Sequence, residues 1–175
     1  MKHLVSELLA IAALLVSCDT ENASNIYSTK YRVAFYYEVS RSPELFNTMG
    51  SPGMFASIRQ VNGKIRIADV SGKYTDYAPD KVQVDFRYGL GGLIVGNTYM
   101  QEYVAYDLAC PNCDRQKYRL SFDSSGRASC SHCGTMYDLN NNGWILSTRD
   151  SVASDLRALY RYRIVYNGLA VNVYN

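Results

Sequence analysis

Four of the five cysteines form two CxxC pairs whose spacing suits a shared metal centre. Cys110 and Cys113 make the first pair, Cys130 and Cys133 make the second, and sixteen residues separate the pairs. Both sulfurs of a CxxC turn point to one side, where backbone amides of the turn can donate hydrogen bonds to them. Two such turns that face each other form a tetrahedral site of four thiolates, and Gly134 supplies the backbone conformation that closes the second turn. Thiolate ligands favour zinc or iron and exclude calcium and magnesium.

Oxidation is the alternative fate of these thiols. Outside the reducing cytosol, Cys110 could pair with Cys133, or each CxxC pair could close on itself. A disulfide within a CxxC turn is strained and redox-labile, so it would imply thiol–disulfide exchange and not a structural role. We expect a metal centre, with the thiol–disulfide protein as an alternative.

The N-terminus has the features of a lipoprotein signal peptide, which we assign to residues 1–17. It begins with a cation and continues with an apolar run at residues 8–16, which is too short to span a bilayer. The run ends in Leu-Val-Ser before Cys18, and this resembles the bacterial lipobox, in which the cysteine is lipidated and becomes the mature N-terminus. We therefore predict a lipid anchor on Cys18, a flexible tether at residues 18–26 and a folded domain at residues 27–175.

The predicted anchor places the protein in the bacterial envelope, with the membrane as a partner. The acidic residues after Cys18, which are Asp19 and Glu21, resemble export signals of surface lipoproteins in some Gram-negative phyla. This favours the outer membrane over the inner membrane. An ordinary secretion signal, with Cys18 as an incidental residue, is the alternative.

The composition describes one folded domain without a strong electrostatic field. The chain has 175 residues, of which 47% are hydrophobic and 19% charged, so it can bury a core. Its 18 Lys and Arg against 16 Asp and Glu give a net charge of +2, which argues against a nucleic-acid partner. Sixteen tyrosines favour strands over helices.

Alternating apolar and polar residues predict an all-β fold. Residues 31–39 (YRVAFYYEV) are typical of a strand, and Asn62-Gly63 and Asn167-Gly168 predict two hairpins with type I′ turns. Further extended segments are expected at 56–61, 64–70, 82–88, 93–95, 98–106, 160–166 and 169–174.

Helical and phosphate-binding patterns are weak. Pro43 permits at most one helical turn at residues 43–46, and only residues 151–159 could form a short helix or a turn. The run Gly89-Leu90-Gly91-Gly92 lacks the GxGxxG spacing of a phosphate-binding loop and no predicted helix follows it. We interpret it as a bulge or a tight turn.

The sequence around the cysteines resembles that of Rieske iron–sulfur domains. In that family one loop carries C-x-H, and a second loop carries C-x2-H-G followed by a small residue and an aromatic one. The segments that resemble the family are residues 91–95, 103–111, 130–138, 159–164 and 169–173. The resemblance covers roughly residues 82–175 and implies a Rieske-like antiparallel β sandwich with two metal-binding loops.

The ligand set departs from the Rieske pattern. A Rieske cluster needs two histidines, but after cleavage of the signal peptide only His132 remains. Cys133 stands where the second histidine belongs, and Cys113 replaces the first with a displacement of one residue. Structural zinc on four thiolates is therefore our first prediction. The alternative is an electron-transfer protein with an all-cysteine [2Fe-2S] cluster, whose potential would fall toward about −400 mV.

Three side chains near the cysteines have roles to test. His132 could be an alternative ligand, an exposed loop residue or a hydrogen-bond donor to sulfur, and Tyr106 and Tyr137 could donate to sulfur or simply pack in the sheet. We expect Trp144 to fill the core beneath the metal loops. One histidine cannot supply a hydrolytic triad separate from the cysteine loop, so we expect a binding or accessory protein, not an enzyme.

Overall fold

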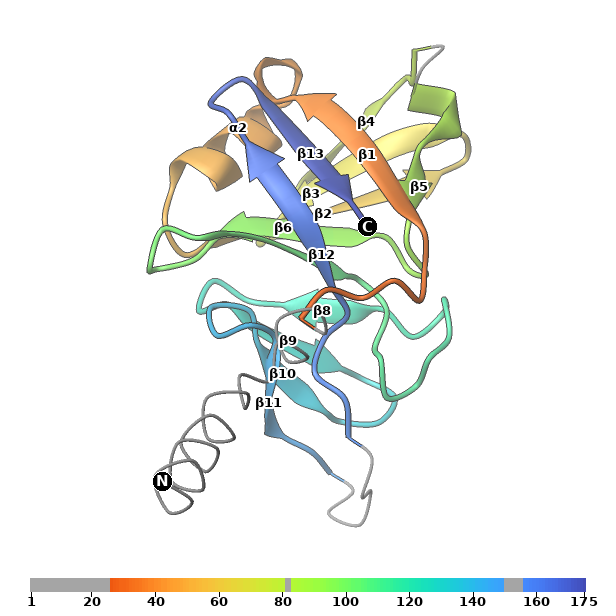
Figure 1. The fold of residues 1–175 in the computed structure, drawn as a ribbon, viewed down its shortest axis with the longest axis vertical. Helices are drawn as coiled ribbons and strands as arrows, with labels where there is room; N and C mark the ends of the chain where they lie inside the picture. Colours follow the sequence, from red (N-terminus) through yellow and green to blue (C-terminus); the bar gives the residue numbers. More distant parts are fainter. Residues whose placement is uncertain (1–25, 81–82, 150–155) are drawn as a thin grey trace, which may run out of the picture.

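The chain folds into two antiparallel β-sheets, as a computed structural model shows (Figure 1). The structure describes residues 26–80, 83–149 and 156–175. Within these residues a larger sheet has the strand order β4-β3-β2-β6-β7-β12-β13-β1-β5, and a smaller sheet has the order β11-β10-β9-β8. The predicted all-β class is confirmed.

The strands are β1 (Val33–Glu38), β2 (Met54–Val61), β3 (Lys64–Asp69), β4 (Tyr74–Tyr77), β5 (Arg87–Tyr88), β6 (Leu93–Asn97), β7 (Tyr103–Asp107), β8 (Leu120–Phe122), β9 (Arg127–Cys130), β10 (Met136–Asp138), β11 (Trp144–Ser147), β12 (Arg161–Tyr166) and β13 (Ala170–Tyr174). The helical segments are η2 (Val39–Arg41), α2 (Pro43–Gly50) and η3 (Gln83–Asp85).

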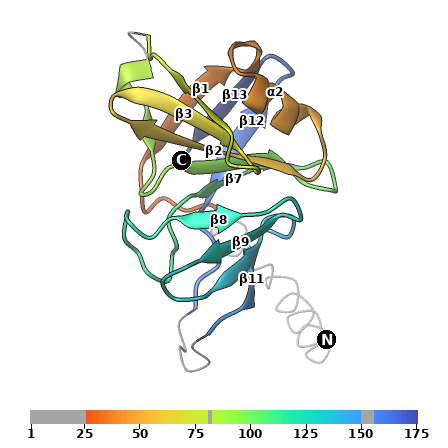
Figure 2. The same cartoon turned by 180° about the vertical axis from the view of Figure 1, so that it is seen from behind.

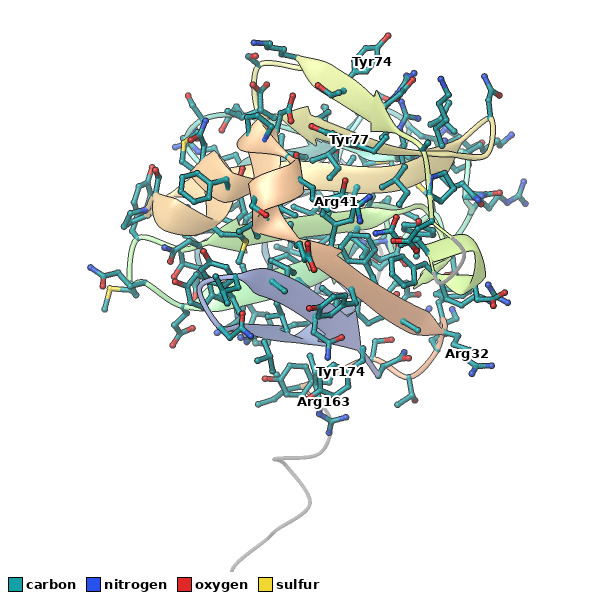
Figure 3. The ribbon with its side chains drawn as sticks, turned by 90° about the horizontal axis from the view of Figure 1, so that it is seen from above. Arg32, Arg41, Tyr74, Tyr77, Arg163 and Tyr174 are labelled. Atoms are coloured by element: carbon teal, nitrogen blue, oxygen red, sulfur yellow. The ribbon has the colours of Figure 1, made fainter. Side chains whose placement is uncertain are left out.

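The larger sheet curves around an apolar cluster, which we call the larger core. On β1 every second residue is buried, and buried residues of β2, β3 and β6 join those of β1, β12 and β13 in this one cluster. The two ends of the sheet therefore form opposite walls. Seen from above, Tyr74 on β4 lies at one side of the molecule, and Tyr174 on β13 and Arg163 on β12 lie at the other (Figure 3).

Helix α2 packs over the larger core, and its length corrects our prediction of at most one turn. It has eight residues, starts with Pro43, and is capped by the Ser42 hydroxyl, which accepts from the amide of Leu45 at 3.3 Å. Leu45 and Met49 are buried in the larger core. The serine cap and the proline at the first position favour a helix start, and burial of one face sustains the second turn.

Strands β6 and β7 separate the larger core from a second one, which we call the smaller core. All five residues of β6 are buried: Leu93 and Val95 face the larger core, whereas Ile94 belongs to the smaller core. The smaller core lies between β2, β6 and β7 and the smaller sheet, which sits below them in both views (Figures 1 and 2). A strand buried on both faces needs apolar residues without alternation.

Both predicted hairpins are present, with different turns. Asn62 and Gly63 have φ of 50° and 75°, as a type I′ turn requires, and they join β2 to β3. The β12–β13 hairpin is also formed, but only Gly168 of its Asn-Gly pair has positive φ. There the Asn167 side chain accepts from the amides of Leu169 and Ala170, which stabilises a longer loop in place of the type I′ turn.

Two predicted strands were too long. Residues 83–85 form the turn η3, so only Arg87 and Tyr88 pair with β1, and the predicted segment 98–106 begins pairing only at Tyr103. Gln101 has φ of 62°, which closes a tight turn at residues 98–102. Of the segment 151–159, residues 156–159 have no regular structure and the rest lies outside the described residues.

The predicted signal peptide at 1–17, Cys18 and nearly all of the tether at 18–26 also lie outside the described residues. Among the residues that are described, no helix combines the length and the apolar character needed to cross a membrane.

Candidate metal centre

The fold brings the four predicted sulfurs together. Cys110 and Cys113 lie in the loop that joins β7 to β8, whereas Cys130 ends β9 and Cys133 lies in the turn that leads to β10. All four Sγ atoms lie within 4.8 Å of one another. The Sγ atoms of Cys110 and Cys133 are 3.6 Å apart, and those of Cys113 and Cys130 are 3.7 Å apart.

These separations match one shared ion and not a pair of disulfides. Four sulfurs bound tetrahedrally at about 2.3 Å from one ion lie roughly 3.8 Å from each other. A disulfide requires about 2.0 Å between sulfurs. All four cysteines are free thiols in the structure. The group can therefore hold a metal ion.

The two CxxC turns share one backbone conformation. The amide of Asp114 donates to the carbonyl of Cys110 at 2.9 Å, and the amide of Gly134 donates to the carbonyl of Cys130 at 2.8 Å. Asp114 has φ of 51° and Gly134 has φ of 74°, so both residues adopt the left-handed conformation. The glycine was expected there, but the aspartate in the same role was missed. The equal spacing after each CxxC pair was the signal for it.

Backbone amides and hydroxyls point at the sulfurs. Burial raises the pKa of the Cys110 thiol to about 11, against the opposing effects of the Tyr137 hydroxyl and of the amides of Cys113 and Asn112. Burial acts to raise the pKa of the Cys133 thiol as well, but hydrogen bonds from the hydroxyl and the amide of Thr135 outweigh it and lower this pKa to about 7. Such donors stabilise the thiolate form that binds a metal.

Burial differs between the two members of each pair. Cys110 and Cys130 are 0% and 2% exposed and belong to the smaller core, whereas Cys113 and Cys133 are half-buried. The cysteine site therefore extends from the smaller core to the molecular surface.

The neighbouring residues divide between contact with sulfur and packing. The Tyr137 hydroxyl lies 3.3 Å from Sγ of Cys110 and also accepts from the side-chain amide of Asn112 at 2.8 Å. The Tyr106 hydroxyl donates instead to the carbonyl of Leu139 at 3.1 Å. Of the two roles considered for Tyr106, packing in the sheet is therefore the one observed. His132 is exposed and stacks on Tyr118, with ring centroids 3.8 Å apart and an interplanar angle of 6°.

Trp144 does not fill the core, and that prediction was wrong. Its side chain is 60% exposed on β11, at the free edge of the smaller sheet. The space below the metal loops is filled by Tyr137, Leu139 and Tyr106, which are fully buried. Neighbouring residues of a strand face opposite sides of the sheet. On β11 it is Ile145, the residue after Trp144, that packs against the smaller core.

A buried carboxylate that the sequence analysis missed supports the first cysteine loop. Asp107 ends β7 and accepts from the amides of Leu90, Gly91 and Ala109 at 2.6, 2.9 and 2.7 Å. It also accepts from the Tyr162 hydroxyl at 2.7 Å. The run Gly89–Gly92 is thus the tight turn that was expected, and its amides wrap around this carboxylate.

The first CxxC turn is also fixed by residues that lie just before β1 and just before β12. The carboxylate of Asp114 accepts from the hydroxyls of Tyr31 and Tyr160 at 2.7 and 2.9 Å, and it pairs with Lys30. The bond from Tyr31 joins residues 83 positions apart in the sequence, and the bond from Tyr160 joins residues 46 positions apart. No local sequence pattern could have predicted them.

No family model matches the chain, and neither a curated protein nor a solved structure matches it. The geometry of the site therefore carries the functional argument.

Proposed function

We propose that this is a lipid-anchored envelope protein whose Rieske-like β domain holds one structural zinc ion through Cys110, Cys113, Cys130 and Cys133. The convergence of four thiol sulfurs within 4.8 Å carries the proposal. Four protein ligands leave no open position for substrate, which is typical of structural and not of catalytic zinc. The protein then acts as a binding or accessory component, not as an enzyme.

The spacing of the sulfurs supports a single ion over a cluster. In a [2Fe-2S] cluster each iron binds two of the thiolates, so sulfurs on different irons are separated by the length of the cluster as well as by two Fe–S bonds. Four sulfurs that all lie within 4.8 Å instead suit one central ion. Zinc has no redox chemistry, and its binding free energy adds to the stability of the folded domain.

The Rieske-like part of the proposal draws support from the arrangement of the sheets. A larger antiparallel sheet carries a smaller one, and the two metal loops lie on the smaller sheet and on its connection to β7. The replacement of the family's histidines by cysteines turns an electron-transfer site into a redox-silent one in this proposal.

Metal analysis of protein purified without oxygen tests the centre. We expect a colourless protein with one equivalent of zinc, and loss of the metal in a Cys113→Ser and Cys133→Ser double variant. Cys18→Ser is the matched control, because it removes a cysteine outside the site and should keep the zinc. A brown protein with two irons per chain would reject zinc in favour of the electron-transfer protein with a [2Fe-2S] cluster. A metal-free protein with disulfides would reject it in favour of the thiol–disulfide protein.

The anchor needs a separate measurement. Mass spectrometry of the N-terminal peptide after expression in a bacterium should find a mature chain that begins at Cys18 with acyl chains attached. Cys18→Ser should release the protein from the membrane fraction. An unmodified Cys18 within a cleaved, soluble chain would reject the anchor and leave the metal centre intact.

A further inference from the structure

A hollow lined by arginines lies beside the Gly89–Gly92 turn, whose Leu90 and Gly91 amides hold Asp107. Its volume is about 270 Å³. Arg59 comes from β2, Arg87 from β5, and Arg119 from the segment between the first CxxC turn and β8. Three distant parts of the chain thus each contribute an arginine to the lining of this hollow.

The positive charge of this hollow is not neutralised by its own residues. No acidic residue is found among the described residues that line it. In the described parts of the chain, the ion pairs within 4.0 Å use Lys30, Arg41 and Arg66, and none uses the arginines of the hollow. Burial lowers the pKa of Arg59, the positive charges of Arg119 and Arg66 lower it further, and Asp76, which is paired with Arg66, opposes them.

Backbone carbonyls hold two of the guanidinium groups in place. Nε of Arg119 donates to the carbonyl of Gly91 at 2.8 Å. Nη1 of Arg87 donates to the carbonyls of Asp85 and Phe86 at 2.8 and 3.2 Å. A carbonyl positions a guanidinium group without cancelling its charge, so the remaining N–H donors can still bind an anion.

Three amides of the glycine-rich turn are already engaged. Leu90 and Gly91 donate their N–H groups to the carboxylate of Asp107, and Gly89 donates to the carbonyl of Arg32. The polar side chains that line the hollow, which are the three arginines together with Gln60 and Gln116, are therefore the main donors for an anion.

We propose that this hollow binds the phosphoryl group of a small phosphate ester or of free phosphate. A carboxylate carries one negative charge and has two oxygens, which one guanidinium group can satisfy in a bidentate manner. A phosphoryl group carries nearly two negative charges at neutral pH and offers three oxygens, which suits three guanidinium groups. This site is separate from the metal centre and does not depend on which metal the cysteines hold.

Calorimetric titration of the metal-loaded protein at constant ionic strength tests the site. Inorganic phosphate and glycerol 3-phosphate should both bind saturably, with acetate at least tenfold weaker, and Arg59→Gln or Arg119→Gln should weaken phosphate binding at least tenfold. Tighter binding of glycerol 3-phosphate than of inorganic phosphate identifies an ester as the ligand, and equal binding identifies the free anion.

Arg163→Gln is the matched control, because Arg163 is exposed on β12 and outside the hollow. It should leave the affinity unchanged within twofold. Arg87→Gln serves where the other variants fail to fold, since Arg87 is exposed and, among the described residues, its side chain hydrogen-bonds to the carbonyls of Asp85 and Phe86; it should also weaken phosphate binding. Absence of saturable phosphate binding, equal binding of acetate, or unchanged affinity in a folded pocket variant would each overturn the proposal.

Discussion

The two sheets differ in how they obtain a core. The larger sheet curves around its own buried residues, which come from nearly all of its strands. The smaller sheet has strands of three or four residues, and its buried members of the smaller core are Leu120, Ala128, Cys130 and Tyr137, with Phe122 and Ile145 packed against them partly buried. Apolar burial by this sheet is therefore small compared with that of the larger sheet, while the entropy cost of ordering its four strands remains.

The position of the cysteines is consistent with the proposed structural metal. Cys110 and Cys130 are themselves buried members of the smaller core, and their partners lie toward the surface. A bound ion would tie the β7–β8 loop to the β9–β10 hairpin, which lie far apart in the chain. Such an ion would supply to the smaller sheet the stability that the larger sheet takes from apolar burial.

Removal of the metal should have the largest effect. We expect a strong chelator, or a Cys130→Ser and Cys133→Ser double variant, to unfold the smaller sheet, because structural zinc contributes on the order of 10 kcal/mol. Amides of β8 to β11 should then exchange rapidly with solvent, while those of β1 and β13 stay protected. Simultaneous loss of protection in both sheets would show that the larger sheet also depends on the metal.

Two neighbouring residues of β6 compare the cores directly. Leu93 and Ile94 are both fully buried but face the larger and the smaller core, respectively. Each change to alanine should cost about 2–5 kcal/mol of unfolding free energy. In hydrogen exchange, L93A should weaken β1 and β13, whereas I94A should first release β8 to β10. Identical exchange patterns in the two variants would mean that the cores unfold as one.

Asp107→Asn tests the joint between the two regions. The carboxylate accepts four hydrogen bonds, and an amide in its place turns one oxygen into a donor, so two of the four donors lose their acceptor. We expect a loss of about 2–3 kcal/mol, measured by denaturant unfolding. Tyr162→Phe removes one donor and leaves the carboxylate, and it should cost about 1 kcal/mol. Equal losses in the two variants would contradict this role of the carboxylate.

The sequence predicted those features that depend on neighbouring residues. Asn62-Gly63 fixes its hairpin through its own backbone preferences, and the CxxC spacing identified the four sulfurs. The alternation of residues 33–38 identified β1 because six residues are enough to show a period of two.

The features that were missed depend on contacts between distant residues. Strands β8 and β10 have three residues each, which is too few to show a period. The side of β11 that is buried is set by its pairing with β10, where a shift in register separates Met136 from Tyr137. Asp107 and Asp114 could not be told from surface aspartates, because their partners lie up to 84 residues away in the chain.

The smallest predicted effect belongs to the larger sheet and depends on pH. Burial acts to raise the pKa of Glu44, but hydrogen bonds from Thr75, from its own amide, and from Tyr77 and Ser42 lower it to about 2. The charged form is therefore favoured by folding. Its stabilisation is complete above the ordinary pKa of 4.5 and is lost as the pH falls toward 2.

Glu44→Gln should therefore destabilise the larger sheet at pH 7 and have little effect at pH 2. Because Glu44 is only partly buried, solvent screening reduces the expected difference to about 1 kcal/mol. The suitable measurement is hydrogen-exchange protection of the β1 and β13 amides. These amides belong to the larger sheet, so they do not report changes that acid would cause in the smaller sheet by releasing a bound metal. Glu38→Gln, on the exposed face of β1, is the control. A difference at Glu44 that persists to pH 2 would assign its effect to packing of helix α2 and not to charge.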